Sequence, residues 1–365
     1  AILFRMQSGI TQEFCQQIPK VELHAHLNGS LSNKTIKKLL DRRRDLKIST
    51  AAFEKGEQRT MGDCFEMFKV IHSLVDSTEV IYEVTKDVIE EFSADGVKYL
   101  ELRSTPKGLV ESGMDKRRYM DAVVGAIRDY KHDNDDVIDV KFLPSIDRGR
   151  SIKDAQENLK LAEEYSISCE DIVTGIDFSG NPYTTDAAKF MPVLQGAQRV
   201  GLKSAVHLSE VKDRSDETRM FLSVPPDRIG HGTFLTDEED VKSSVLESRI
   251  PIEVCVSSNI ASNTSPPEHI KHHSVWWMGQ EHPCVVCTDD KGVFSTGLSS
   301  EYFIIANALS LSEEQTLKLS ESAIDFIFAD ENMKAKLKQI WKESKKDEVL
   351  EITFVTCLSC LDMKN

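Results

Sequence analysis

The sequence lacks the marks of a membrane protein and of a secreted protein. No run of about 18 apolar residues occurs among its 365 residues, so we expect no membrane-spanning helix. The opening residues, AILFRMQSGI, show neither the apolar stretch nor the cleavage site of a signal peptide. The eight cysteines are therefore expected to be reduced thiols of a cytosolic protein.

Positive charge is also scarce in this chain. Lysine and arginine number 45 against 60 aspartates and glutamates, which gives a formal net charge of −15 at pH 7. This balance argues against a surface for polymeric nucleic acid or for an anionic membrane. A small anionic ligand stays compatible with it, because a pocket can be locally positive on an acidic protein.

Several common binding motifs are missing as well. The chain has no Walker motif and no glycine-rich dinucleotide fingerprint. The pair Cys284-x-x-Cys287 is similar to half of the zinc site of the nucleotide deaminases, but that site also needs an H-x-E motif, and none of the ten histidines begins one. Both cysteines stand in an apolar run and are predicted to be core residues.

Short apolar runs recur along the chain with amphipathic segments between them. Runs rich in valine, isoleucine and leucine predict eight buried parallel strands, over 20–27, 98–104, 138–146, 171–179, 203–210, 227–235, 250–258 and 283–290. Strands that alternate with helices predict the α/β class and a single (β/α)8 TIM barrel. Extra helices are expected after the first strand and at the C-terminus, over 60–75, 77–96, 299–310, 312–328 and 331–345.

One domain is predicted for the whole chain, residues 1–365, because no linker rich in proline, glycine or serine divides it. The barrel is expected over about 18–310 and the C-terminal helices over about 311–346, while the tail 349–365 stays unassigned. An open doubly wound sheet with a helical C-terminal domain is the alternative fold.

Histidines and aspartates stand at the ends of the predicted strands. His24 and His26 end the first strand, and alternate residues of a strand point to the same side. His207 ends the fifth strand and Asp289 the eighth, and in a barrel these ends surround one mouth. A single histidine is more typical of a packed core, but three imidazoles and one carboxylate suit Zn²⁺ with a position left for water. We predict one zinc ion per chain, because the fourth strand offers no lysine to bridge two metals.

Three further residues stand close to this predicted site. His231 ends the sixth strand and is expected to orient or deprotonate the attacking water. Glu210 lies three residues after His207, within reach of a substrate beside the metal, and the alternative is a carboxylate that only begins a helix. Asp290 is expected to point away from its neighbour Asp289 and to bind substrate.

The motifs around these residues resemble those of the adenosine/AMP deaminase family. The resemblance covers about residues 15–345 and rests on the stretches His24–Leu27, Leu100–Pro106, His207–Glu210, Arg228–Gly232 and Cys287–Asp290. It implies a zinc barrel that deaminates a 6-aminopurine by hydrolysis. By the same resemblance, Glu210 protonates the ring nitrogen beside the reacting carbon and His231 handles the water proton. Asp290 and the backbone N–H of Gly180 bind the purine ring.

One position departs from the classical adenosine enzymes of the family. They carry an acid two residues after the H-x-H motif, whereas this chain has Asn28, which can donate a hydrogen bond to a 5′-phosphate. Other expected substrate contacts are His26, His72, Ser104, Thr105, Pro106, Lys107 and Asp147. We therefore expect a nucleotide substrate. Within the family, the chain most resembles the members that convert N6-methyl-AMP into IMP and methylamine.

Two other functions remain open at this point. An adenosine deaminase that releases ammonia is the alternative among enzymes, and Asn28 argues against it. A catalytically silent binding barrel is the other, and the complete set of predicted ligands together with Glu210 and His231 argues against it. The partner we expect is a small purine nucleotide, bound by a monomer.

Overall fold

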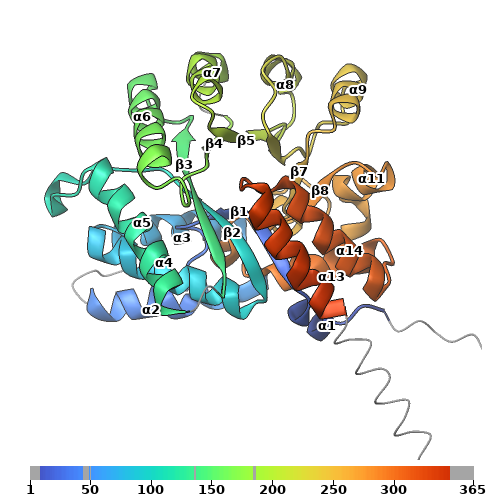
Figure 1. Ribbon diagram of the computed structural model, residues 1–365, viewed down its shortest axis with the longest axis horizontal. Coiled ribbons are helices and arrows are strands. Elements are labelled where there is room, and N and C mark those ends of the chain that lie inside the picture. The colour runs from blue at the N-terminus through green and yellow to red at the C-terminus, as the bar shows by residue number, and fades with distance from the viewer. Residues whose placement is uncertain (1–8, 44–48, 50, 135–136, 184–185, 346–365) are drawn as a thin grey trace, which may run out of the picture.

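Eight short parallel strands form one sheet in the computed structural model of the chain, which describes residues 9–43, 49, 51–134, 137–183 and 186–345 (Figure 1). Their bounds are β1 Lys20–His26, β2 Val97–Ser104, β3 Asp139–Asp147, β4 Gly175–Ser179, β5 Lys203–Leu208, β6 Arg228–His231, β7 Ile252–Val254 and β8 Cys284–Val286. Each strand pairs with the next one along the chain, in the order β1 to β8.

The sheet closes on itself between β1 and the residues after β8. The backbone N–H of His26 donates to the carbonyl of Asp289 over 3.0 Å, and the N–H of Asp289 donates to the carbonyl of His24 over 2.8 Å. Ala25 and Asp289 form the corresponding parallel bridge. The closure confirms the predicted (β/α)8 barrel, and it sets the first and last strand ends side by side.

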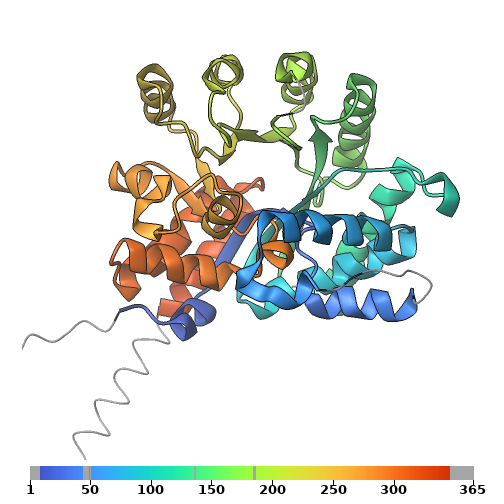
Figure 2. The ribbon, with the colours of Figure 1, turned by 180° about the vertical axis from the view of Figure 1, so that it is seen from behind.

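Helices cover the outside of the barrel, as the two opposite views show (Figures 1 and 2). Their bounds are α1 Gln12–Gln17, α2 Asn33–Arg42, α3 Met61–Leu74, α4 Thr78–Ala94, α5 Lys116–Asp133, α6 Ile152–Ser168, α7 Met191–Arg199, α8 Ser215–Leu222, α9 Glu239–Ser248, α10 Val256–Ala261, α11 His273–Gly279, α12 Lys291–Phe294, α13 Leu298–Ala308 and α14 Glu313–Ser322. Residues 331–345 are also helical. The extra helices predicted after the first strand correspond to α3 and α4, which begin at serine or threonine caps.

The last two strands are shorter than the sequence predicted. The run 250–258 was expected to be one strand, but β7 ends at Val254 and α10 begins at Val256. The cause is a distant contact: the buried Glu301 carboxylate accepts hydrogen bonds from the backbone N–H groups of Val256 and Ser257 over 3.0 and 3.2 Å. Such a contact stabilises the first turn of a helix.

The sixth strand is also shorter than expected. It was predicted to extend to residue 235, but β6 ends at His231, where the backbone adopts φ 62° and leaves the extended region. Pro192 stands in the first turn of α7, where the missing N–H costs nothing.

The strand side chains build the core. Both faces of the sheet are covered, so nearly every strand residue is buried. In the part of the chain that the structure describes, no helix is both long and apolar enough to cross a membrane. The N-terminal residues 1–5 and the unassigned tail 349–365 lie outside the described residues.

Candidate metal centre and active site

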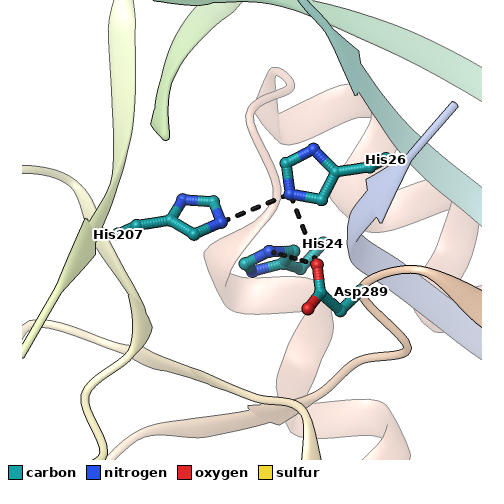
Figure 3. Close-up of side chains that lie close together, drawn as sticks. All are labelled: His24, His26, His207 and Asp289. Atoms are coloured by element: carbon teal, nitrogen blue, oxygen red, sulfur yellow. Dashed lines mark hydrogen bonds and ion pairs between the residues drawn. The ribbon is translucent and has the colours of Figure 1, made fainter. Parts of the chain in front are cut away.

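Four side chains from three strand ends meet at the mouth of the barrel (Figure 3). Nε2 of His26 lies 3.2 Å from Nε2 of His207 and 3.3 Å from Oδ1 of Asp289. Nε2 of His24 lies 3.4 Å from the same Asp289 oxygen. The ligand atoms of the four residues all lie within 4.8 Å of one another. One small cation fits among these donors, as the sequence predicted.

The donor atoms fit a metal ion because without one they repel each other or lack hydrogen-bond partners. The Nε2 atoms of His26 and His207 face each other, so at least one of them must carry no proton. Nε2 of His24 is buried and makes no hydrogen bond of normal geometry to any described residue. A buried imidazole nitrogen without a partner is costly, and coordination by a cation removes that cost.

Groups behind the cluster contact three of the four ligands. Nδ1 of His24 lies 2.8 Å from the Glu253 carboxylate. Nδ1 of His207 lies 3.1 Å from the carbonyl of Phe178. Asp289 accepts a hydrogen bond from the hydroxyl of Ser258 over 2.6 Å. These contacts direct Nε2 of both imidazoles and the Oδ1 atom of Asp289 toward the cluster, which is the usual way in which metal ligands are oriented.

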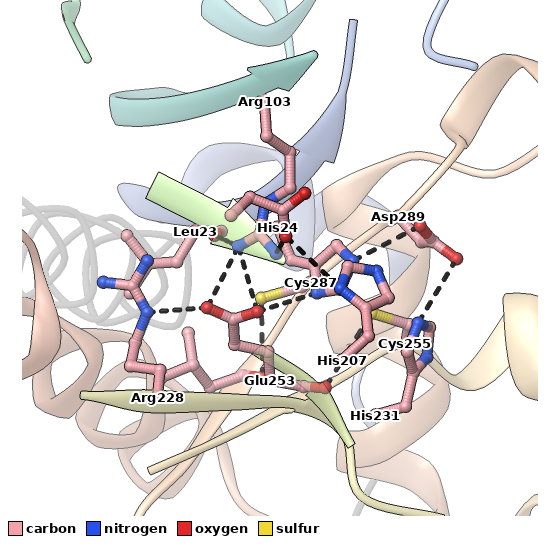
Figure 4. A network of polar contacts seen from close by, with 12 residues as sticks. Leu23, His24, Arg103, His207, Arg228, His231, Glu253, Cys255, Cys287 and Asp289 are labelled. Atoms are coloured by element: carbon pink, nitrogen blue, oxygen red, sulfur yellow. Dashed lines mark hydrogen bonds and ion pairs between the residues drawn. The ribbon is translucent and has the colours of Figure 1, made fainter. Parts of the chain in front are cut away.

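A buried ionic network lies beside the ligands His24 and His207 (Figure 4). Arg103 is fully buried and joins two carboxylates: it contacts Asp177 over 3.0 Å and Glu253 over 2.9 Å. Glu253 also pairs with Arg228 over 2.6 Å. Asp177 in turn lies 3.3 Å from Nδ1 of His207. Because Arg103 touches the carboxylates behind both His24 and His207, it links the supports of two ligands.

The proposed acid and base lie together beside the cluster. Nε2 of His231 is 4.0 Å from a carboxylate oxygen of Glu210 and 3.9 Å from Oδ2 of Asp289. Burial raises the pKa of Glu210 above its ordinary value and holds the pKa of His231 well below its own. Those shifts favour a protonated carboxyl group and a neutral imidazole. A water molecule between these groups would contact both of them.

A cavity of about 510 Å³ opens above the cluster. Most residues that the sequence predicted as substrate contacts line it, namely His26, Asn28, His72, Ser104, Thr105, Lys107, Asp147, Gly180, Glu210 and Asp290. Pro106 is buried and does not line the cavity. The hydroxyl of Ser104 is engaged with that of Tyr119 over 2.5 Å.

Two glycines leave room at the cavity floor. A side chain at Gly29 would overlap the carboxyl group of Asp290, at 1.6 Å from its oxygen. Gly180 has φ 101°, which a residue with a side chain rarely adopts, and a Cβ atom there would lie 2.3 Å from Asp147. Burial and the neighbouring Asp289 raise the pKa of Asp290 well above its ordinary value, so this carboxyl can donate a hydrogen bond.

One wall of the cavity carries positive charge. Lys107, His72 and Arg150 all line the cavity and lie near one another. The pKa of His72 is lowered by partial burial and then by Lys107 and Arg150, and the pKa of Lys107 is lowered by burial and then by Arg150. Asp147 accepts a hydrogen bond from Nε of Arg150 over 3.3 Å and neutralises part of this charge. The wall is therefore suited to an anionic group.

The sequence reasoning missed several residues of this site. Arg150 stands in a polar loop, where an arginine is usually solvated, so nothing distinguished it. Glu253 and Arg103 are charged residues inside apolar strands, and that contrast was a usable signal. Ser258 was assigned to a strand and Asn259 was left just beyond it, whereas both lie on α10, where they contact Asp289 and His231 respectively.

Comparisons with known proteins agree with this geometry. A family model described as adenosine deaminase matches residues 19–343. The N6-methyl-AMP deaminase of Danio rerio is 48% identical over 339 residues, which cover 91% of this chain and 97% of that protein. The apo structure of the N6-methyl-AMP deaminase from Arabidopsis thaliana aligns with a TM-score of 0.83 at 35% identity, over 92% of this chain and 100% of that one. The Arabidopsis ADAL structure complexed with IMP aligns with a TM-score of 0.82 at 34% identity, over 92% and 99% of the two chains.

The fold and the site define an α/β barrel with a candidate metal cluster at the carboxyl ends of its strands. The family match covers most of the chain, and the identity to the zebrafish protein extends over the same region. The chain belongs to the adenosine deaminase family. The resemblance seen in the motifs is thereby confirmed, and with it the expectation of a hydrolytic purine deaminase.

Proposed function

We propose that this chain is a zinc-dependent hydrolase that converts N6-methyl-AMP into IMP and methylamine. The observation that carries the proposal is that one cavity is lined by three kinds of groups: members of the candidate metal cluster, the carboxyl group of Glu210 with its neighbour His231, and the cationic set Lys107, His72 and Arg150. The cluster and Glu210 suit a reaction at C6 of a purine, and the cationic residues suit a 5′-phosphate. The relatives named N6-methyl-AMP deaminase support the choice of substrate.

Zinc is the metal we propose, with His24, His26, His207 and Asp289 as its ligands. Three imidazoles and one carboxylate are a donor set typical of catalytic zinc. When bound, such an ion supplies Lewis acidity that lowers the pKa of a coordinated water to about 7. One ion per chain is expected, since the four donors lie within 4.8 Å of one another.

Glu210 carries the proton transfers in this proposal. Its protonated carboxyl group donates a proton to N1 of the purine, which makes C6 more electrophilic. The resulting carboxylate accepts one proton of the attacking water, so the carboxyl group is regenerated. The second water proton leaves with the amine. One water and one N6-methylpurine thus give one 6-oxopurine, protonated at N1, and one methylamine.

The purine ring is oriented by two groups that line the cavity, Asp290 and Gly180. Asp290, whose raised pKa favours the protonated form, donates a hydrogen bond to the imidazole-ring nitrogen of the purine. The backbone N–H of Gly180 donates to the purine from the end of β4. With the ring held in this way, C6 faces the metal cluster and Glu210, which is the arrangement that the reaction requires.

The 5′-phosphate is bound at the cationic wall. Lys107, Arg150 and His72 supply charge and hydrogen-bond donors there, and Asn28 stands at the position where the classical adenosine enzymes carry an acid. Oδ1 of Asn28 is buried and makes no hydrogen bond to any described residue, and the NH2 group of the same amide is the donor that would bind a phosphate oxygen. A nucleoside has no phosphate to pair with these cationic residues, and we therefore favour a nucleotide substrate.

The experiment is hydrolysis of N6-methyl-AMP by metal-loaded enzyme in water enriched in 18O. Mass spectrometry should detect IMP with a single 18O atom together with free methylamine, and Glu210→Gln should form both products at least about a hundredfold more slowly at equal protein concentration. Unlabelled IMP would contradict a hydrolytic attack. No conversion by an enzyme that retains its metal would contradict the proposed substrate.

A further inference from the structure

A chain of buried hydrogen bonds lies behind His231, on the side away from the cavity. Nδ1 of His231 is 3.2 Å from Nδ2 of Asn259. Oδ1 of Asn259 is 3.1 Å from Nε2 of His272. All three residues are at most 2% exposed. The three residues are linked in this order, so the direction in which each hydrogen bond is donated decides which nitrogen of His231 carries the proton.

The direction of donation is fixed at the His272 end of this row of hydrogen bonds. The backbone N–H of Ser274 donates to Nδ1 of His272 over 3.2 Å, and a backbone N–H can only donate. Nδ1 of His272 is therefore an acceptor without a proton. Burial lowers the pKa of His272 to about 4, so the ring is neutral at pH 7. A neutral ring with a bare Nδ1 carries its proton on Nε2, the atom that faces Asn259.

The proton on Nε2 of His272 then determines the orientation of the Asn259 amide. The Nε2–H of His272 must donate to the amide oxygen, which turns the NH2 group toward His231. The opposite amide orientation would set two donors against each other. Thr264 supports the same orientation: its hydroxyl donates to the Asn259 carbonyl over 3.1 Å, and its oxygen lies 3.5 Å from the amide nitrogen as an acceptor.

His231 consequently accepts a hydrogen bond at Nδ1. A neutral imidazole that accepts at Nδ1 carries its proton on Nε2. That atom is the one 4.0 Å from Glu210 and 3.9 Å from Asp289, at the edge of the cavity. The ring therefore presents an N–H donor, and not a lone pair, to a water molecule in the site.

We propose that Asn259 and His272 are positioning residues that hold His231 in its Nε2–H tautomer, so that His231 donates a hydrogen bond to the attacking oxygen and does not take its proton. The inference rests on the proposed deaminase function, in which Glu210 accepts the water proton. It decides between the two roles, orienting or deprotonating water, that the sequence left open for His231. A preorganised donor at this point stabilises negative charge that develops on the oxygen.

The tautomer can be read directly in the unmodified, metal-loaded enzyme. Protein labelled with 15N in histidine gives ring 1H–15N correlation patterns that differ between the Nε2–H and the Nδ1–H forms. The signals of His231 are identified by their loss in His231→Gln. We expect the Nε2–H pattern, and an Nδ1–H or doubly protonated ring would overturn the proposal. This reading does not depend on turnover, so a failure of the proposed substrate would be distinguishable from it.

Variants test the consequence for catalysis. In Asn259→Asp the carboxylate can only accept a hydrogen bond. It therefore favours a proton on Nδ1 of His231 and leaves Nε2 without one. We expect kcat to fall about a hundredfold, the usual cost of losing one preorganised donor, with KM and metal content unchanged. If His231 were the base, this substitution would create a carboxylate–imidazole pair and preserve or raise kcat, which would overturn the proposal.

A second pair of variants guards against a merely structural effect. His272→Leu removes the donor to Asn259 and should lower kcat, whereas His272→Gln restores an N–H donor and should recover most of it together with the Nε2–H signal. Equal losses in both variants, with an unchanged His231 signal, would contradict the proposal. His282→Gln is the matched control, because His282 is also buried, its Nε2 atom lies 2.8 Å from the carbonyl of Ile250, and its ring packs against Trp277. This control should behave as the wild type.

Discussion

Replacement of Arg103 by methionine should weaken both the fold and the metal site. The side chain is fully buried and pairs with Asp177 over 3.0 Å and with Glu253 over 2.9 Å. Glu253 keeps Arg228 in the variant, whereas Asp177 loses its only arginine partner among the described residues. Removing one partner of a buried ion pair costs about 3–5 kcal/mol, because it leaves an uncompensated buried charge. We expect a loss of unfolding free energy of this size, measured by denaturant titration.

The same substitution should affect metal retention, because the two carboxylates orient His24 and His207. Loss of such support typically costs about ten- to a hundredfold in metal affinity. Competition with a chelator under native conditions measures this. Arg148→Met is the matched control: Arg148 is as buried and pairs with Glu217 over 2.7 Å, so it should lose stability but keep its metal. Metal retention in Arg103→Met equal to that of the wild type would refute the reasoning.

Three further expectations concern the cavity. Glu210→Gln should lower kcat by at least about a hundredfold, the range for loss of general acid catalysis, while elemental analysis finds the metal unchanged; near-normal turnover would assign the proton transfer to another group. Asn28→Asp should reduce kcat/KM far more for the nucleotide than for the nucleoside, because it sets a negative charge against the phosphate; equal reductions would speak against that contact. Arg150→Ala should reduce kcat/KM for the monophosphate by about ten- to a hundredfold, the value of a charge-assisted hydrogen bond, and leave the nucleoside unaffected; an unchanged nucleotide rate would remove Arg150 from the binding wall.

The local sequence pattern predicted the parts of the fold that depend on local structure. Apolar runs located β1 to β6 because each strand is buried on both faces, and alternation along β1 correctly set His24 and His26 on one side. The four metal-site residues were found because a closed parallel barrel brings all its carboxyl strand ends to one mouth. Those predictions needed only strand order and direction.

The parts that depend on distant contacts were not predictable in the same way. The run after Val254 has the apolar, β-branched composition of a strand, and it becomes α10 because Glu301, some 45 residues later, accepts its first N–H groups. The supports Glu253 and Asn259 act through residues far away in the sequence, namely Arg103 and His272. Arg150 joins Lys107 only through the packing of two loops at the cavity wall.

The central claim is that one cavity binds both the N6-substituted purine and the 5′-phosphate of the substrate. The most direct measurement compares kcat/KM for N6-methyl-AMP, AMP, N6-methyladenosine and adenosine, with one metal-loaded enzyme preparation. We expect N6-methyl-AMP to be the best of the four and both nucleosides to react at least about tenfold worse than their nucleotides, since each lacks the charge-assisted contacts of the phosphate. A preference for adenosine over both nucleotides would contradict the assignment of the cationic wall to phosphate and, with it, the proposed function.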